Sequence, residues 1–292
     1  ALEELEQQGG FLFFYFSTTD QVSHMFFRAH DRSHPARTAV DEPHAGVLEQ
    51  TYRRLDRVVG QARKRLPAGA LLLVMSDHGF GPASYLFDLN GWLRQRGYLA
   101  LRTDPIDEPL GGIDWPKTQA YGLGLNGLYL NQRGRERHGV VPAARREALL
   151  DRLSRQLLAL RHPGTGQRVV TQVVRPDRVY PGPEVHKAPD LILGYGRGIK
   201  VHDLSATGGV GGELFSVNRS PWSGDHCGDR RLVPGILFSN RPLRPDGASL
   251  VDLAPTVMKF LGVPAPRGGG WTGHNLLRVN GTEGKDGKGQ DR

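Results

Sequence analysis

The stretch Leu71-Leu-Leu-Val-Met-Ser-Asp77-His78-Gly79-Phe80-Gly81 places an acidic and an imidazole side chain directly after five apolar residues. A short apolar run of this kind is typical of a buried strand. Burying both polar groups without partners would cost several kcal/mol, whereas the carboxyl end of a strand in an open α/β sheet faces a ligand-binding crevice. Carboxylate and imidazole groups also bind Zn²⁺ and similar divalent ions. The sequence therefore predicts that Asp77 and His78 are metal ligands.

A second polar pair follows a second apolar run. Residues 11–16, Phe-Leu-Phe-Phe-Tyr-Phe, predict a central strand of a parallel sheet. Asp20 and His24 come next, and residues four apart share one face of a helix. On its own, such a pair is more typical of an exposed helix or a helix cap. Its position after a predicted strand favours a pair of ligands for one metal ion.

A third candidate lies in the loop Ser223-Gly-Asp225-His226-Cys227-Gly-Asp229. Glycine permits sharp turns, so the flanking glycines allow His226 to point into a cleft. Asp225 and Asp229 either orient the imidazoles or form hydrogen bonds within the loop. Cys227 has no second thiol in the chain to join it, so we expect it to pack rather than to bind metal.

These segments supply five candidate ligands: Asp20, His24, Asp77, His78 and His226. Five exceeds the number of protein ligands in one catalytic zinc site and falls short of two complete sites. Two ions about 4 Å apart are the usual clamp on the attacking and leaving oxygens of a phosphoryl displacement. We therefore expect a two-metal centre whose second ion needs at least one further ligand.

The rest of the pattern predicts an α/β domain, because apolar strands alternate with amphipathic helices. In the Gly-rich segment 121–131 we expect a further strand, with Asn126 as a candidate substrate contact, and in 205–222 a loop. Apolar spacing predicts helices over 44–65, 86–96, 142–160 and 249–261, and strands over 70–75, 168–174, 190–194 and 232–239.

The composition narrows the class of protein. The 292 residues carry a net charge of +8, and 38% are hydrophobic, which indicates a globular chain with a large core. No segment approaches the roughly 18 apolar residues of a membrane span. The single cysteine excludes an internal disulfide and favours a reducing compartment such as the cytoplasm. The positive charge suits a small anionic phosphate ester, and without a dense basic block it gives little support to nucleic-acid binding.

The motifs resemble those of a known superfamily. Asp20-x-x-x-His24, Ser76-Asp-His-Gly79 and Gly224-x-His226 occur in the order found in the alkaline phosphatase superfamily, and they look most like its type I phosphodiesterase/nucleotide pyrophosphatase branch. Residues 250–264 are similar to the helix that closes many domains of that superfamily. The resemblance covers about residues 10–277 and implies a three-layer α/β/α fold with a mostly parallel central sheet.

The resemblance also implies how the ligands are shared. Asp20, His24 and His226 would hold one zinc ion, and Asp77 and His78 would help to hold another, with Mn²⁺ or another divalent ion as an alternative. In the family pattern an Asp and a Thr or Ser nucleophile complete the second site, and both lie upstream of these motifs.

The same resemblance implies a domain organisation. We expect residues 1–279 to be the C-terminal part of one catalytic domain, which by itself is inactive because the nucleophile is missing. Within it we expect an inserted cap at about 103–220, followed by a disordered tail at 280–292.

The expected reaction is metal-dependent hydrolysis of a phosphodiester or nucleotide pyrophosphate bond. A sulfatase, a phosphomonoesterase or a phosphomutase of the same fold is an alternative, because the nucleophile that separates these classes is not among the motifs. An alternative of another kind is a non-catalytic protein that binds metal or polyanions. The presence of five candidate ligands favours the enzyme.

Overall fold

The computed structural model describes residues 10–104, 110–180, 182–244, 247–264 and 272–278. They divide into two compact units. The larger unit contains the described residues of 16–55 and 78–234, and the smaller unit contains those of 10–15, 56–77 and 235–278. Helix α2, Val47–Arg65, has residues in both units. Among the described residues, no helix combines the length and the apolar character needed to cross a bilayer.

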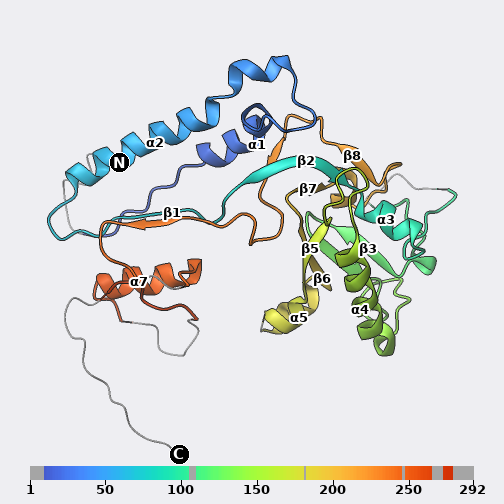
Figure 1. Ribbon diagram of the computed structural model, residues 1–292. Coiled ribbons are helices and arrows are strands. Elements are labelled where there is room, and N and C mark those ends of the chain that lie inside the picture. Colours follow the sequence, from blue (N-terminus) through green and yellow to red (C-terminus); the bar gives the residue numbers. More distant parts are fainter. Residues whose placement is uncertain (1–9, 105–109, 181, 245–246, 265–271, 279–292) are drawn as a thin grey trace, which may run out of the picture. The chain divides into compact units, whose positions relative to one another are not determined.

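Figure 1 shows the elements along the chain. The larger unit contains the helices and helical turns α1 Thr18–His30, η2 Ala39–His44, α3 Leu89–Gln95, η3 Trp115–Lys117, α4 Ala143–Ala159, α5 Pro176–Val179, η4 Pro183–Lys187 and α6 Asp203–Ala206. Its strands are β2 Gly81–Phe87, β3 Ala120–Leu123, β4 Gly127–Leu130, β5 Val170–Val174, β6 Leu191–Tyr195, β7 Gly198–Val201, β8 Phe215–Val217 and β9 Gly224–Asp225. The smaller unit contains β1 Leu73–Met75, β10 Leu237–Ser239, η5 Leu250–Asp252 and α7 Leu253–Phe260.

The core of the larger unit forms where α4 packs on an antiparallel sheet of order β3-β4-β6-β5. Helix α4 buries Leu149, Leu150, Leu153 and Leu157, which fall on one face at helical spacing. Burying each leucine stabilises the fold by roughly 1.5–3 kcal/mol before entropy is counted. The predicted helix over 142–160 is therefore confirmed, and so are the strands predicted at 168–174 and 190–194.

Strand β2 organises the second sheet. It pairs with β7 in parallel, with Phe87 opposite Val201, and with β8 in antiparallel fashion. The beginning of β2 also pairs with the short strand β9, so that Gly81 lies opposite Asp225. This last pairing brings the loop around His226 to the amino end of β2.

The α/β class is confirmed, but the strand pairing differs from a mostly parallel sheet. Among the described residues β2 and β7 form the one parallel pair. The segment 121–131 is a hairpin of β3 and β4 rather than one strand, because the chain reverses at Gly124 with a φ of +74°. The predicted loop 205–222 contains β8, and the predicted strand 232–239 is reduced to β10.

Residues 11–16 do not form the predicted strand. They belong to none of the described strands, and Phe11 and Phe13 are 64% and 68% exposed. An apolar run becomes a central strand only where neighbours bond to both of its edges. The predicted tail 280–292 lies outside the described residues, and the cap at 103–220 and the three-layer arrangement stay predictions.

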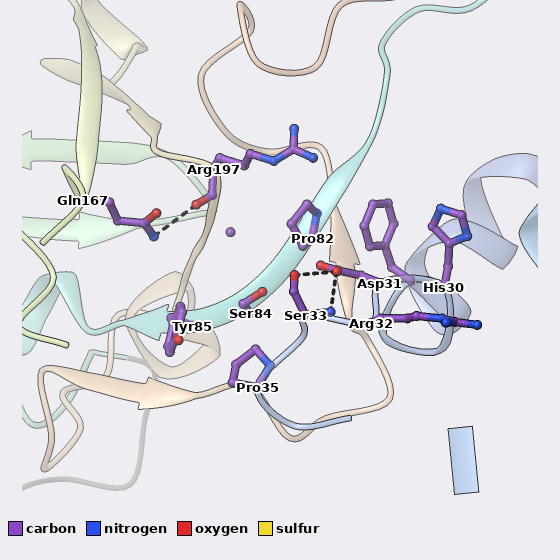
Figure 2. A pocket seen from close by; sticks show the side chains of 12 residues that line it. His30, Asp31, Arg32, Ser33, Pro35, Pro82, Ser84, Tyr85, Gln167 and Arg197 are labelled. Carbon is purple, nitrogen blue, oxygen red and sulfur yellow. Dashed lines mark hydrogen bonds between the residues drawn. The ribbon is translucent and has the colours of Figure 1, made fainter. Parts of the chain in front are cut away.

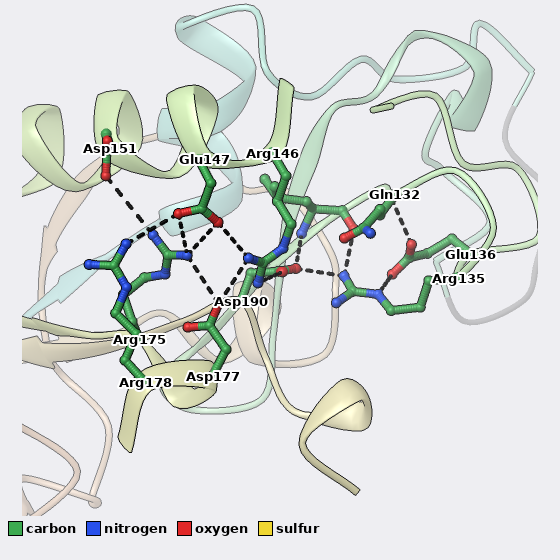
Figure 3. A network of polar contacts seen from close by, with 11 residues as sticks. Gln132, Arg135, Glu136, Arg146, Glu147, Asp151, Arg175, Asp177, Arg178 and Asp190 are labelled. Carbon is green, nitrogen blue, oxygen red and sulfur yellow. Dashed lines mark hydrogen bonds and ion pairs between the residues drawn. The ribbon is translucent and has the colours of Figure 1, made fainter. Parts of the chain in front are cut away.

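An ionic network ties α4 to the sheet (Figure 3). Its centre is Asp190, just before β6, whose side chain is 0% exposed. Asp190 Oδ2 accepts hydrogen bonds from Arg135 Nη2 at 2.6 Å and from the Leu130 backbone at 2.8 Å, and Oδ1 accepts one from Arg146 Nη2 at 3.0 Å. Removal of one member of such a buried network leaves an uncompensated charge, which is costly.

We expect Asp190→Asn to lower the free energy of unfolding by about 2–3 kcal/mol, because Arg135 and Arg146 each lose a charge-assisted hydrogen bond to a buried carboxylate. Both arginines keep another carboxylate partner, Glu136 and Asp177 respectively. Urea denaturation measures this change. The control is Glu49→Gln, which removes the exposed pair between Arg53 and Glu49 and should cost at most about 0.5 kcal/mol. Equal effects of the two substitutions would contradict the structural role of Asp190.

Candidate metal centre

Four of the five predicted ligands come together in the larger unit. Asp20 and His24 lie one turn apart on α1, as their spacing predicts. His78 precedes β2, and His226 follows β9. Donor atoms of Asp20, His78 and His226 all lie within 4.8 Å of one another. Three segments distant in sequence therefore place one carboxylate and three imidazoles in a single cluster.

Asp20 Oδ1 is the centre of this cluster. It lies 3.6 Å from His24 Nε2 and 3.5 Å from His226 Nε2. Both distances are too long for a hydrogen bond, and this buried oxygen has no hydrogen-bond partner among the described residues. A buried acceptor left unsatisfied is costly. A cation bound between Asp20 and the two imidazoles would remove this cost.

The orientation of His24 is fixed by the loop at Gly224. His24 Nδ1 lies 2.8 Å from the Gly224 carbonyl oxygen. A carbonyl can only accept a hydrogen bond, so Nδ1 carries a proton. In the neutral imidazole this leaves the lone pair on Nε2, the nitrogen that faces Asp20. Such a bond at the far nitrogen is the usual way in which proteins orient a histidine that binds metal.

Two aromatic rings also hold His24, and the sequence analysis did not identify either of them. Trp222 stacks on the imidazole with ring centroids 3.9 Å apart and an interplanar angle of 23°, and Phe80 meets it edge-on at 4.7 Å. Trp222 is 41% exposed. Its position two residues before Gly224 is the sequence signal for this role, since the same short loop supplies both contacts to His24.

His226 and His78 lie face to face. Their ring centroids are 3.6 Å apart and their planes differ by 13°. Burial, and then the neighbouring His78 imidazole, lower the pKa of His226 below its ordinary value. Two charged imidazoles at this distance would repel each other, and a neutral imidazole is the form that binds metal.

The loop that carries His226 is joined to α1 by backbone contacts. The Ser223 amide donates to the His24 carbonyl at 2.8 Å, and the Arg28 amide donates to Ser223 Oγ at 3.1 Å. A Cβ atom at Gly224 would overlap the Ser23 carbonyl oxygen and approach the Cβ of Phe27 to 2.8 Å. Only glycine permits this close approach, so the sequence of the loop sets the distance between the ligands.

The other predicted site residues support the loop. Asp225 Oδ1 accepts hydrogen bonds from the backbone amides of His226 and Cys227 at 2.6 and 2.7 Å. These bonds hold the loop backbone and do not involve the His226 imidazole ring. Asn126 Nδ2 donates to the carbonyls of Cys227 and Leu193, both at 2.7 Å. Burial, and then Asp225, raise the pKa of Cys227 to about 12, so the thiol stays protonated at neutral pH.

Asp229 ends the loop and fastens it to the antiparallel sheet. Its buried carboxylate accepts hydrogen bonds from Arg231 Nη2 at 2.5 Å and from Thr171 Oγ1 on β5 at 2.8 Å. The Arg231 hydrogen bond is the main reason why the pKa of Asp229 falls to about 2. The sequence left open whether Asp229 orients an imidazole or forms hydrogen bonds within the loop. The structure shows the second kind of contact, together with a bond to the sheet.

Asp77 belongs to the smaller unit, whereas Asp20, His24, His78 and His226 belong to the larger one. Its role as a ligand stays a prediction.

The depressed pKa of Asp229 makes the stability of the loop depend on pH. The unfolded carboxyl titrates near 3.9, so the stabilisation is complete well above pH 4 and is lost as the pH falls through about 2. We expect Asp229→Asn to cost about 2 kcal/mol at pH 7 and about half of that at pH 3. Urea denaturation at the two pH values measures the difference, and an equal cost at both would contradict it.

Comparison with known proteins identifies a family. The family model for type I phosphodiesterase / nucleotide pyrophosphatase matches residues 1–207. The match includes Asp20, His24, Asp77 and His78, whereas His226 lies beyond it. The mixed α/β structure is consistent with the alkaline phosphatase-like fold that the motifs imply. A search of curated proteins finds no match. The chain belongs to the type I phosphodiesterase / nucleotide pyrophosphatase family of hydrolases.

Proposed function

We propose that the protein hydrolyses phosphodiester or nucleotide pyrophosphate bonds with two divalent metal ions, preferably Zn²⁺. The first ion would be held by Asp20, His24 and His226, and the second by Asp77 and His78 with at least one further ligand. The observation that carries the proposal is the buried Asp20 Oδ1, which faces two imidazole nitrogens without a hydrogen bond. The family match supports the class of reaction.

Two of the distances between donor atoms support a zinc site. Bonds of about 2.0–2.1 Å at tetrahedral angles separate neighbouring donors by about 3.3–3.4 Å. The oxygen of Asp20 lies 3.5 and 3.6 Å from His226 Nε2 and His24 Nε2, close to this spacing. The donors that all lie within 4.8 Å of one another are those of Asp20, His78 and His226, so His24 and His226 would have to approach each other to share one ion. The mixture of one carboxylate with imidazoles is one that zinc accepts readily.

The residues of the cluster have distinct tasks in this proposal. Asp20 supplies negative charge, and His24 and His226 supply neutral nitrogen donors. The Gly224 carbonyl keeps the proton of His24 on Nδ1, away from the ligand position. The lowered pKa of His226 keeps its ring neutral and ready to bind at neutral pH.

Bound divalent ions supply positive charge that stabilises the phosphoryl oxygens during displacement. The hydrolysis also needs an oxygen nucleophile, and the proposal assigns none of the five ligands to that role because each of them holds metal. The nature of the nucleophile separates a diesterase from a phosphomonoesterase, a sulfatase or a phosphomutase. The family match favours the diesterase or pyrophosphatase reaction.

Metal analysis of the purified protein tests the proposal directly. We expect up to two zinc ions per chain, and we expect Asp20→Asn and His226→Ala each to lose at least one ion. His138→Ala is the matched control, because His138 is an exposed histidine outside the cluster. Absence of bound metal from the unaltered protein in zinc-containing buffer would overturn the proposal.

Paired substrates test the reaction class. In a protein that also supplies the nucleophile, activity toward bis-p-nitrophenyl phosphate or p-nitrophenyl thymidine monophosphate should exceed activity toward p-nitrophenyl phosphate, and Asp20→Asn should abolish it. A preference for the monoester would favour a phosphomonoesterase instead. Metal binding without turnover of any ester would favour a non-catalytic metal-binding protein.

The stacking of Trp222 on His24 predicts a measurable effect on metal affinity. Trp222→Ala frees one face of the imidazole, and we expect it to weaken Zn²⁺ binding about 10-fold, as is typical when a group that orients a ligand is lost. Trp222→Phe keeps an aromatic ring and should stay close to the unaltered protein. Titration against a chromophoric chelator measures both, with the exposed aromatic Tyr180→Ala as control. Unchanged affinity in Trp222→Ala would show that the stack does not position His24.

A further inference from the structure

A pocket of about 570 Å³ opens beside the C-terminal end of α1. Figure 2 shows Gln167 and Arg197 on one side of it, His30, Asp31 and Arg32 on the other, and Pro82 and Ser84 of β2 between them. All of these residues belong to the larger unit. This volume lies in the range of small-molecule binding sites, so the pocket is large enough for an organic ligand.

Two arginine side chains in the lining of the pocket carry positive charge that no described carboxylate neutralises. Neither the Arg32 nor the Arg197 guanidinium forms an ion pair within the part of the chain that the structure describes. The one carboxylate in the lining, Asp31, accepts two hydrogen bonds through Oδ1, from the amide and the hydroxyl of Ser33 at 2.9 and 2.6 Å. The guanidinium groups therefore outnumber the acid, and a guanidinium is well suited to bind phosphate.

A polar floor and an apolar wall complete the pocket. The side chain of Ser84 lies in the lining, and its hydroxyl forms no hydrogen bond with the described residues. Gly198, with a φ of +77°, packs near it, so that an added Cβ would lie 3.6 Å from the Ser84 hydroxyl. Phe27 and Pro82 supply apolar surface. The Gln167 side chain holds the backbone carbonyl of Arg197 at 3.2 Å, which fixes the base of the arginine.

The pocket shares its framework with the candidate metal centre. Phe27 lies one helical turn after His24 on α1, and Pro82 pairs with Gly224, whose carbonyl orients His24. A ligand in the pocket would therefore contact α1 and β2, which also frame the candidate metal centre. The pocket lies at the C-terminal end of α1, whereas Asp20 lies near its N-terminal end.

We propose that this pocket binds an organic phosphate of nucleotide size, with its phosphate on Arg197 and Ser84 and its organic part against Phe27 and Pro82. Arg32 adds positive charge at the opposite side. The proposal deepens the proposed function, because it gives a phosphate-bearing substrate or product a second point of attachment. It needs no metal ion, and this property separates the two proposals experimentally.

Calorimetric titration with adenosine monophosphate in the presence of EDTA tests the pocket. We expect binding without metal, and we expect adenosine and inorganic phosphate each to bind at least about 10-fold more weakly. Arg197→Gln should weaken binding of the monophosphate about 10- to 100-fold, the range given by one charge-assisted hydrogen bond. Arg137→Gln makes the same charge change at an exposed position outside the pocket and should leave the affinity unchanged.

The metal-centre variants distinguish the possible failures. Asp20→Asn and His226→Ala should retain binding of adenosine monophosphate in EDTA, whatever they do to zinc content. Binding that requires zinc and disappears in Asp20→Asn would place the ligand at the metal centre and overturn the pocket while leaving the proposed function intact. Unchanged affinity in Arg197→Gln, or equal affinity for inorganic phosphate, would also overturn it.

Discussion

The hydrogen bond between His24 Nδ1 and the Gly224 carbonyl joins residues 200 positions apart in the chain. The candidate metal centre depends on it more than on any other contact, because it sets the direction of the His24 ring and places a proton on Nδ1. The same loop residue cannot carry a side chain without overlapping α1. Helix and loop therefore hold one geometry together, because Ser223, three residues before His226, is hydrogen-bonded to His24 and Arg28 on α1.

This arrangement stores an electrostatic cost in the folded protein. A buried carboxylate oxygen without a hydrogen bond is unfavourable in the absence of a cation. The surrounding contacts, such as the Asp229 link to β5, offset that cost and keep the ligands in place. A bound divalent ion would satisfy the same groups, so that its binding energy adds to the stability of the fold.

Local patterns in the sequence were sufficient to predict the residues that form the cluster. The four-residue spacing of Asp20 and His24 became one face of α1, and the glycines around His226 became the close approach to that helix. Other features depend on contacts between distant segments. The apolar run 11–16 has the composition of a buried central strand, yet its place in a sheet depends on segments far away in the sequence. Likewise Trp222 looks like an isolated aromatic until the loop places it on His24.

The high pKa of Cys227 affects how readily its thiol is oxidised or alkylated. Thiolates, rather than thiols, react with peroxides and alkylating reagents, and a pKa of about 12 leaves almost no thiolate at neutral pH. The one sulfhydryl of the chain lies directly beside His226, where oxidation would add bulk and charge next to a candidate ligand. In the metal-free chain, a protonated thiol reacts slowly, which limits oxidation at that position. This slow reaction also means that a cysteine introduced at an exposed site can be labelled selectively in the presence of the native one.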